Sequence, residues 1–322
     1  MRSNVLFALD NLRGGDTFAD AVHEGLTRAR KAIPCKYLYD EPGSVLFDRI
    51  CDLPEYYPTR TETALLRRHA DEIADLAGPA CMVVEFGSGS STKTRILLDH
   101  LDSPTTYVPI DVSCDHLRAS AAALATQYPA LGVYPLCADF MGLAALPAFP
   151  SAGTRRRLGF FPGSTIGNLM PDEARSFMAG AAALLGKGGG LLLGVDLKKD
   201  PALLHAAYND SEGITAAFTL NLMARMNREL EANFDLAGFV HDARYNPVAG
   251  RIEIYLRSLQ DQTATVAGRR IGFTAGERIH VEYSYKYDVE GIAALARDGG
   301  FTLEKTWVDD AGQFSVSYLT VA

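Results

Sequence analysis

The sequence predicts an α/β protein with an open, mostly parallel sheet, helices on both faces of that sheet, and an inserted α+β subdomain. Two observations support this prediction. Between residues 80 and about 200, short apolar runs alternate with helical patterns, which is typical of parallel strands joined by crossover helices. Over 238–245, 251–259 and 278–287, strand-like runs follow one another without a helix between them, which indicates an antiparallel sheet.

The elements before the inserted region follow in order. An amphipathic helix is expected over 15–33, where Phe18, Val22 and Leu26 have helical spacing, and a second helix over 61–78. The strands of the sheet are expected at 81–84, 107–111, 132–136, immediately before the loop that begins near 160, and at 189–196. A helix that includes 95–98 should follow the first of these strands.

The pattern changes after residue 196, and this change defines the domain organisation. A helical stretch over 201–232 precedes the consecutive strands, while a helix over 289–299 and strands over 301–308 and 314–320 would add an antiparallel hairpin to the edge of the parallel sheet. We therefore expect a ligand-binding core over 61–196, completed by the C-terminal helix and strands of 287–322. The inserted subdomain, 197–286, and an N-terminal helical segment, 1–60, would bind the substrate.

Composition and charge exclude several classes of protein. The 322 residues are 48% hydrophobic and 22% charged, as in ordinary soluble globular proteins. The net charge of −8 argues against a nonspecific nucleic-acid binder, and no apolar run approaches the ~20 residues that span a bilayer. The apolar run within residues 1–10 is too short for a signal peptide.

The cysteines and histidines predict neither disulfides nor a metal site. The five cysteines are odd in number and none has C-x-x-C spacing, which favours reduced thiols in a cytoplasmic protein. The seven histidines are scattered, without H-x-x-x-H spacing, so no metal site is expected. A G-x-S-x-G nucleophile elbow is also absent from the sequence.

A glycine turn after the first predicted strand is the main candidate for ligand binding. Glu85 precedes Gly87 and Gly89, and a helix should begin near Lys93. A phosphate loop and a dinucleotide fingerprint each require a glycine where Thr92 stands. A third alternative is S-adenosylmethionine (SAM), whose cationic amine suits a carboxylate before the glycines. A tight turn without a ligand is the fourth.

Two further acidic residues favour SAM among these alternatives. Asp111 ends the second predicted strand, 24 residues after Gly87, where an acid can bind the ribose hydroxyls. Asp139 and Phe140 follow the third strand and could bind the amino group and the ring of adenine. Since Glu85, Asp111 and Asp139 lie at or near the carboxyl ends of successive strands, we expect a SAM site at this edge of the sheet.

Four other groups are candidates for contact with the substrate. The loop 163–169 (GSTIGNL) follows a sheet strand and contains Asn168, which could instead cap the next helix. Glu282 and Ser284 share one face of a strand and could bind a planar ring with two nitrogens, or could simply form a solvated polar face. The aromatic groups over 37–47 and 54–60 suit a cationic amine, or could form a tyrosine-rich core.

Together these motifs resemble one family. The strings LPEYYPTRTE at 53–62 and GSTIGNL at 163–169, with the glycine turn and Glu282 and Ser284, are similar to the SAM-dependent histidine Nα-methyltransferases of ergothioneine biosynthesis. The resemblance covers nearly the whole chain. It implies a class I SAM-methyltransferase fold with a Rossmann-like sheet, and three methyl transfers that convert L-histidine to hercynine.

The resemblance also implies residue roles. The substrate's carboxylate and amino group would contact Tyr56, Asn168 and Tyr208, and its imidazole would contact Glu282 and Ser284. Tyr39 and Phe47 would surround the reacting nitrogen, and the catalytic candidates are Tyr39 and Asn168. Gly163 and Thr165 would belong to the substrate loop. The cofactor would contact Glu85, Gly87, Gly89, Lys93, Asp111, Asp139 and Phe140.

One departure from the family keeps a second substrate open. Ile254 stands where the family carries Met facing the ring pocket, and Thr219 replaces an expected polar amide. The same reaction on another aromatic amino acid, such as tryptophan, is therefore the alternative. Glu282 and Ser284 favour histidine, because indole has a single N–H. We expect a cytoplasmic monomer that acts on a small-molecule amino acid, without nucleic acid or membrane.

Overall fold

The computed structural model describes residues 17–89, 91–149 and 153–322, which form two compact units. The first unit contains Pro58–Lys199 and Tyr285–Ala322, and the second contains the segment that ends at Tyr57 together with Asp200–Ser284. The apolar run predicted within 1–10 lies outside the described residues. No helix in the described part of the chain is long and apolar enough to cross a membrane.

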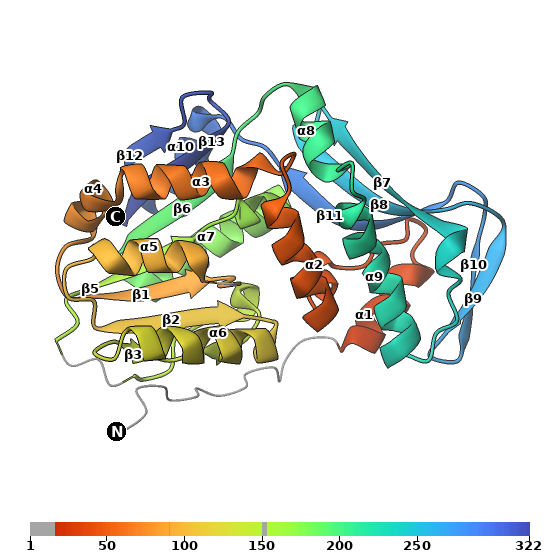
Figure 1. The fold of residues 1–322 in the computed structure, drawn as a ribbon, viewed down its shortest axis with the longest axis horizontal. Helices are drawn as coiled ribbons and strands as arrows, with labels where there is room; N and C mark the ends of the chain where they lie inside the picture. Colours follow the sequence, from red (N-terminus) through yellow and green to blue (C-terminus); the bar gives the residue numbers. More distant parts are fainter. Residues whose placement is uncertain (1–16, 90, 150–152) are drawn as a thin grey trace. The chain divides into compact units, whose positions relative to one another are not determined.

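The first unit is built on one mixed sheet with the strand order β12-β13-β6-β5-β1-β2-β3, and β4 also pairs with β2 (Figure 1). The strands from β6 to β3 are parallel, whereas β13 runs antiparallel to both β6 and β12. The mostly parallel sheet and its antiparallel C-terminal edge hairpin are therefore confirmed. The strands are β1 (Cys81–Phe86), β2 (Thr106–Asp111), β3 (Gly132–Val133), β4 (Leu136–Cys137), β5 (Arg156–Phe161), β6 (Gly190–Asp196), β12 (Phe301–Val308) and β13 (Phe314–Val321).

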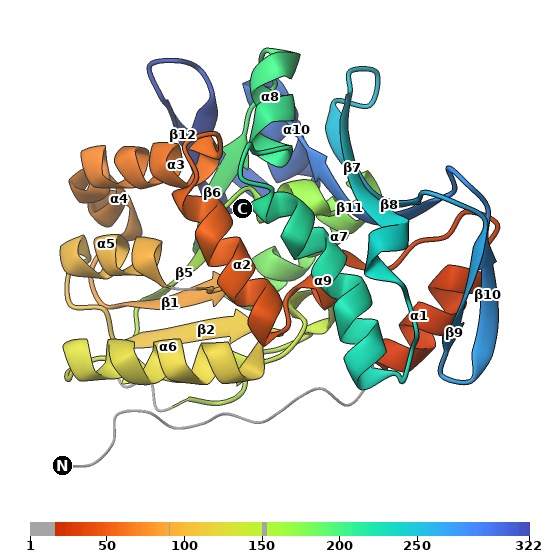
Figure 2. The same ribbon diagram turned by 45° about the vertical axis from the view of Figure 1, so that its right-hand side comes forward.

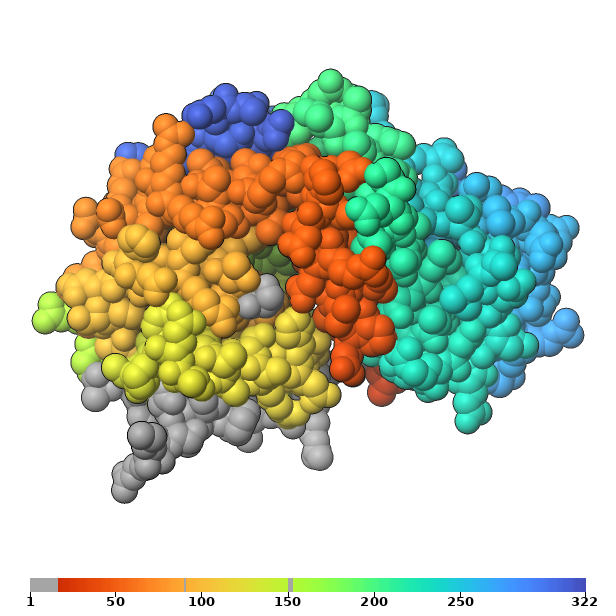
Figure 3. Space-filling view, in the orientation of Figure 1, coloured from red at the N-terminus to blue at the C-terminus, as the bar shows by residue number. Residues whose placement is uncertain are grey.

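Helices cover both faces of this sheet because its strands are apolar on both sides; β1 and β6 are buried along their whole length. One face packs against α3 (Tyr57–Arg68), α4 (Ala70–Ala77), α5 (Thr92–His100) and α6 (Cys114–Gln127). The side chains of these helices, orange to yellow, form the surface of the unit in Figure 3. The other face packs against α7 (Pro171–Leu185) and α10 (Val289–Asp298).

The second unit has a separate apolar core. Figure 2 shows the helices and strands of this unit as ribbons. Its three-stranded sheet has the order β11-β8-β7, and a two-stranded hairpin is formed by β9 and β10. The strands are β7 (Phe239–Asn246), β8 (Arg251–Ser258), β9 (Gln262–Val266), β10 (Arg269–Phe273) and β11 (Arg278–Tyr285). The helices are α1 (Phe18–Thr27), α2 (Glu41–Asp52), α8 (Pro201–Tyr208) and α9 (Ile214–Glu229), with short 3₁₀ turns at Cys35–Leu38 and Leu236–Gly238.

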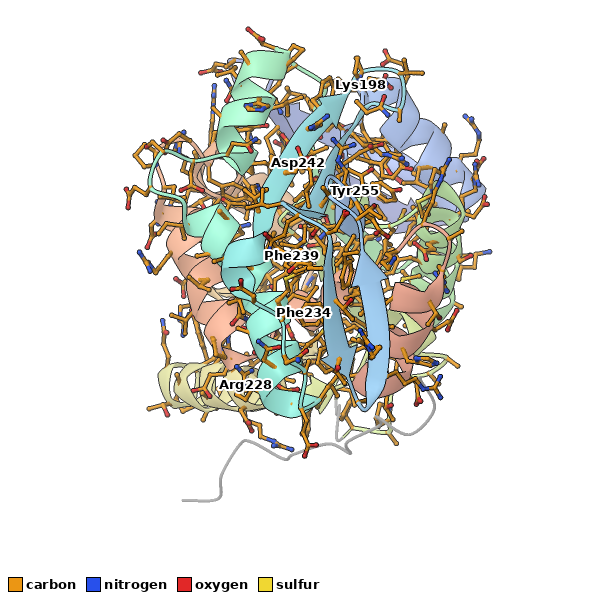
Figure 4. All side chains as sticks on the ribbon, turned by 90° about the vertical axis from the view of Figure 1, so that its right-hand side faces the viewer. Lys198, Arg228, Phe234, Phe239, Asp242 and Tyr255 are labelled. Carbon is orange, nitrogen blue, oxygen red and sulfur yellow. A yellow bond between two sulfur atoms is a disulfide. The ribbon has the colours of Figure 1, made fainter. Side chains whose placement is uncertain are left out.

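The sequence-based prediction missed the β9–β10 hairpin. The hairpin turns at Ala267 and Gly268, which both have positive φ, and its apolar side chains alternate along each strand. The ring of Phe273 packs against Phe239 and Phe234, with ring centroids 5.3 and 5.9 Å apart. Phe234 and Phe239 are labelled in Figure 4, which shows this side of the second unit. The hairpin therefore belongs to the core of the second unit.

Three predicted elements are interrupted in the structure. The helix predicted over 61–78 is two helices, α3 and α4, that break at His69. The stretch 201–232 is also two helices, because Gly213 has a positive φ and the Asp210 carboxylate accepts the Ile214 and Thr215 amides at the start of α9. The strand predicted over 132–136 is divided into β3 and β4 near Pro135. The helix predicted over 15–33 covers only Phe18–Thr27.

The prediction of reduced thiols throughout is wrong for one pair, because Cys114 and Cys137 form a disulfide with Cα atoms 5.2 Å apart. Cys114 opens α6 just after β2, while Cys137 ends β4, which pairs with β2 at Asp111. Parallel pairing therefore brings together two residues that are 23 positions apart. The prediction failed because it considered only local C-x-x-C spacing.

Candidate active site

The glycine turn follows β1 and folds back toward the end of β2. Gly87 and Gly89 have φ values of +74° and +47°, a region that disfavours side chains. The amide of Gly87 donates to the Ile110 carbonyl at 2.8 Å, and α5 begins shortly afterwards at Thr92. The backbone at the carboxyl edge of the sheet is therefore accessible to a ligand, at the start of a helix.

Asp111 and Asp139 lie at the ends of paired strands beside this turn. The Oδ2 atom of Asp111 accepts the Gly89 amide at 3.2 Å, and its Oδ1 accepts the Ser113 amide at 2.9 Å. Asp139 comes two residues after Cys137, the partner of Asp111 in the β2–β4 register, and its Oδ1 accepts the Met141 amide at 3.0 Å. Each oxygen can accept a second hydrogen bond, so a fixed carboxylate is available to the hydroxyl or amino groups of a nucleoside.

The ring of Phe140 lies close to the glycine turn. A Cβ atom built on Gly87 would be 4.0 Å from Cε1 of Phe140, and the Phe140 ring packs against Phe161 and Phe177 with centroids 5.4 and 5.5 Å apart. These contacts fix a half-buried apolar surface between the turn and Asp139. A flat heteroaromatic ring is the ligand group that such a surface accommodates.

Ser88, between the two glycines, provides an independent indication of a ligand. The residue is only 6% exposed, and its Oγ has no hydrogen-bond partner among the described residues. A buried hydroxyl without a partner is unfavourable, and a polar ligand in the turn would satisfy it. Together with Asp111, Asp139 and Phe140, this group fits the polar and aromatic parts of SAM.

Glu85 lies beneath the turn rather than on its surface. It is 1% exposed, and its Oε2 accepts hydrogen bonds from the Thr94 hydroxyl at 2.7 Å and from the Tyr107 hydroxyl. Burial raises the pKa of Glu85 to about 8, against the hydrogen bonds from Tyr107 and Thr94, which lower it. A cationic group near this carboxyl would favour its ionised form, as the predicted contact with the SAM amine requires.

Lys93 and Gly163 share a partner that the sequence-based prediction did not assign to the site. The Lys93 ammonium pairs with the carboxylate of Glu62 on α3, and the Gly163 amide donates to both oxygens of that carboxylate at 2.9 and 3.1 Å. Glu62 belongs to the string LPEYYPTRTE, so the family motif was a signal that could have identified it. Thr165, in the same loop, bonds the Pro162 carbonyl at 2.9 Å.

Asn168 does not cap the following helix, so that alternative is wrong. The helix α7 is capped at Met170, whose amide donates to the Glu173 carboxylate at 2.8 Å. Asn168 instead ends a 3₁₀ turn, Thr165–Asn168, at the carboxyl side of β5 and is half-buried there. It thus lies in the loop predicted to contact the substrate.

In the second unit, Glu282 and Ser284 project into the protein rather than into solvent. They are 7% and 4% exposed, whereas Tyr283 and Tyr285 on the other face of β11 are only half-buried. The alternative of a solvated polar face is therefore wrong. The Ser284 hydroxyl forms a 2.8 Å hydrogen bond with the hydroxyl of Tyr208 at the end of α8. The unit thus holds a buried carboxylate close in sequence to a paired hydroxyl.

Aromatic side chains from α2, α8, α9 and the loops that contain Tyr39 and Tyr56 form a continuous cluster in the same unit. The Tyr39 ring lies 5.5 Å from Phe47 and 5.4 Å from Phe218, a residue that the prediction missed. Tyr56 lies 6.4 Å from Phe47 and 6.2 Å from Tyr208. These centroid distances are typical of stable aromatic pairs. The cluster therefore connects the predicted residues Tyr39, Phe47, Tyr56 and Tyr208.

Hydrogen bonds fix two ends of this cluster. Asp40, next to Tyr39, caps α2 through the Gly43 amide and also accepts from Asn221 at 2.7 Å. His241 contacts the Tyr208 carbonyl through Nε2 and the Thr219 hydroxyl through Nδ1, both at 2.9 Å. Burial lowers the pKa of His241, which favours the neutral ring.

Ile254 is 1% exposed on β8, and Thr219 is completely buried on α9. Ile254 belongs to the apolar core of the second unit, and the Thr219 hydroxyl forms a hydrogen bond with His241. The polar amide expected at position 219 is thus replaced by a hydroxyl with a partner of its own.

Comparison with models of protein families identifies the family of this chain. The family model of the histidine-specific, SAM-dependent methyltransferases matches residues 18–321. The chain belongs to this family. It is therefore a SAM-dependent methyltransferase. The glycine turn of its first unit, with Asp111 and Asp139, forms the candidate cofactor site.

Individual relatives and a solved structure agree with this assignment. The histidine N-alpha-methyltransferase of Mycolicibacterium smegmatis is 43% identical over 97% of this methyltransferase and 99% of the relative. That of Mycobacterium tuberculosis is 42% identical over 98% and 99%. A SAM-dependent methyltransferase from Clostridium acetobutylicum is similar in fold, with a TM-score of 0.52 and 11% identity over 86% of this chain and 98% of the other. The predicted class I methyltransferase fold is thus confirmed.

Proposed function

We propose that this methyltransferase transfers three methyl groups from SAM to the α-amino nitrogen of L-histidine and so produces hercynine. The observation that best supports histidine is the burial of Glu282 and Ser284 on one face of β11. Imidazole has two ring nitrogens, so one N–H can donate to the carboxylate while the hydroxyl binds the other nitrogen. The 42–43% identity to histidine N-alpha-methyltransferases supports the same substrate.

The amino-acid part of the substrate needs hydrogen-bonding partners for its carboxylate and its amine. Tyr56 and Tyr208 carry hydroxyls at one end of the aromatic cluster, and Asn168 offers both a donor and an acceptor. We propose that these three residues bind the α-carboxylate and α-amino groups, with Gly163 and Thr165 shaping the loop that presents Asn168. Such contacts would orient the nitrogen, and orientation provides much of the rate in a displacement reaction.

The cofactor would supply a methyl group on a sulfonium. The neutral amine would attack this methyl carbon in line, so that an N–C bond forms, the S–C bond breaks and S-adenosylhomocysteine leaves. We propose that Gly87, Gly89, Asp111, Asp139, Phe140 and Lys93 bind it, with Glu85 close to its amine. The nitrogen loses a proton with each of the first two transfers, and Tyr39 is the candidate relay. As methyl groups accumulate, the nitrogen has fewer N–H donors, and the rings of Tyr39, Phe47 and Phe218 become suitable partners through cation–π contact.

The reaction can be tested with the purified protein, SAM and L-histidine. Fragmentation of the product in a mass spectrometer distinguishes methyl groups on the α-nitrogen from methyl groups on the ring. The proposal predicts that mono-, di- and trimethylated α-nitrogen appear in sequence and that the trimethylated form accumulates. Ring-methylated histidine would contradict the proposed orientation, and a product that stops at one methyl group would contradict hercynine as the product.

A further inference from the structure

The carboxylate of Glu62 connects two parts of the first unit that are far apart in the sequence. Glu62 projects from α3 and its side chain is completely buried, while Lys93 beside it is 16% exposed. The Lys93 ammonium, on the first turn of α5, pairs with Oε2. The same carboxylate accepts the Gly163 amide, where the loop to Asn168 begins. One buried group therefore contacts a cofactor candidate and the first residue of the substrate loop.

The sheet has a specific adaptation to this carboxylate at Gly194. A Cβ atom built on Gly194 in β6 would lie 1.8 Å from Oε1 and 2.9 Å from Cδ of Glu62. Such distances do not occur between real atoms, so any larger residue at 194 would displace the carboxylate or the strand. Gly194 lies in the middle of a fully buried strand, where glycine is otherwise unfavourable. This exception indicates that the position of Glu62 matters.

Anchoring α3 to the sheet does not by itself require a charge. Burial of an ion pair carries a large desolvation cost, and well-packed apolar residues often give equal or greater stability. The apolar side chains Leu65 and Leu66 of α3 already pack in the core on this face. The presence of a buried carboxylate at position 62 is therefore better explained by its ion pair with the Lys93 ammonium and its hydrogen bonds with the Gly163 amide.

We propose that Glu62 is a positioning residue that fixes Lys93 for the cofactor and the 163–168 loop for the amino-acid substrate, with Gly194 providing the space it occupies. This inference rests on the proposed function for the identity of the substrate. It differs from a purely structural role in one measurable respect. Disturbing Glu62 should weaken the binding of both ligands, whereas removing the Lys93 charge should weaken the binding of the cofactor alone.

Calorimetric titration with S-adenosylhomocysteine and, separately, with L-histidine tests the proposal without turnover. We expect E62A to weaken the binding of each ligand by about tenfold or more, because it removes a charged acceptor from two donors. E62Q retains an acceptor for the Gly163 amide but lacks the charge facing Lys93. It should therefore weaken the binding of S-adenosylhomocysteine more than the binding of histidine, and K93M should weaken the binding of S-adenosylhomocysteine alone. G194A should reproduce the loss of both ligands.

The control is G272A, another strand glycine, around which a Cβ atom would meet nothing within 4 Å. It should bind both ligands as wild type does. The stoichiometry of binding reports the fraction of folded protein, so misfolding appears there and not in the dissociation constant. Dissociation constants of E62A, E62Q and G194A that equal those of wild type would overturn the proposal. If wild type binds S-adenosylhomocysteine but not histidine, the proposed substrate is wrong, while the cofactor part of this experiment still tests Glu62 and Lys93.

Discussion

The hydroxyl groups of Tyr208 and Ser284 are 2.8 Å apart and form a hydrogen bond between α8 and β11. Both residues are buried, at 9% and 4% exposure. The contact fixes the rotamer of a serine that lies two residues from Glu282 on the same face of the strand. It therefore connects the groups proposed for the amino-acid part of the substrate with those proposed for its ring.

Removing the Tyr208 hydroxyl tests the importance of this contact. Y208F keeps the ring but removes both the hydrogen bond to the buried Ser284 hydroxyl and the contact proposed between the Tyr208 hydroxyl and the substrate, and each hydrogen bond is worth about 0.5–1.5 kcal/mol. We expect the KM for histidine to rise roughly tenfold or more, with little change in the KM for SAM. The loss in the double variant Y208F/S284A should be smaller than the sum of the two single losses, because each single change removes the same shared contact.

The matched control for this prediction is Y255F. Tyr255 lies on β8, where its hydroxyl bonds Glu253 at 2.8 Å, and its side chain belongs to the opposite face from the buried Ile254. It should leave the KM for histidine unchanged. Equal effects of Y208F and Y255F would show that the loss reflects general destabilisation of the unit.

Glu282 should determine the preference for imidazole. In E282A the imidazole N–H loses a charged acceptor worth about 1.5–3 kcal/mol, so kcat/KM for histidine should fall about ten- to a hundredfold. Use of tryptophan, if wild type shows any, should fall less. E253A removes a carboxylate from the neighbouring strand and serves as control. If E282A retains wild-type kcat/KM for histidine, Glu282 does not bind the ring.

The aromatic cluster should matter most for the last methyl transfer. F218L shortens the surface that faces Tyr39 and Phe47, so cation–π stabilisation of the methylated nitrogen decreases by about 0.5–2 kcal/mol. We expect mono- and dimethylhistidine to accumulate relative to the trimethyl product, as followed by mass spectrometry over time. F239L instead alters a core aromatic on β7 that packs against Phe273 of the β9–β10 hairpin, and it should keep the wild-type distribution of products.

Glu85 should make the stability of the protein depend on pH. Its pKa rises from the ordinary glutamate value of 4.5 to about 8 in the folded protein, mainly because the carboxyl is buried. The folded state then binds the proton more tightly than the unfolded state. The free energy of unfolding contributed by this group therefore falls as pH rises from about 4.5 to about 8, and is level above that.

Urea unfolding of wild type and E85Q across this range tests the sign. Glutamine cannot ionise, so the stability of E85Q relative to wild type should improve steadily as pH rises toward about 8. Parallel pH profiles for the two proteins would show that Glu85 does not titrate in this window. E72Q is a useful comparison, because bonds to Lys305 and Trp307 lower the pKa of Glu72 and reverse the direction of the effect.

The sequence was sufficient to predict the sheet and the position of Asp111 and Asp139 at its carboxyl edge. Alternation of apolar runs and helices predicted the parallel strands, and the acids after them predicted the ligand edge, because parallel strands end at one edge. Local spacing could not predict long-range contacts. The Cys114–Cys137 disulfide depends on the pairing of β2 with β4, and the contact of Glu62 with Gly163 joins residues 101 positions apart.

The errors in the predicted elements have a similar origin. The break at 209–213 depends on Asp210 capping α9, which periodicity over a long helical window does not detect. The burial of Glu282 and Ser284 could not be predicted from alternation, because a period of two identifies two faces but not which of them is inside. Phe218 was missed because it is one of several apolar residues on α9, and helical spacing does not distinguish it from the others.

The most direct test of the proposed specificity is a competition among substrates. Purified protein is incubated with SAM and an equimolar mixture of the twenty amino acids, and the products are identified by mass spectrometry. We expect trimethylhistidine to be the product and the other amino acids to remain unmodified. Methylated tryptophan or tyrosine in place of methylated histidine would contradict the role assigned to Glu282 and Ser284.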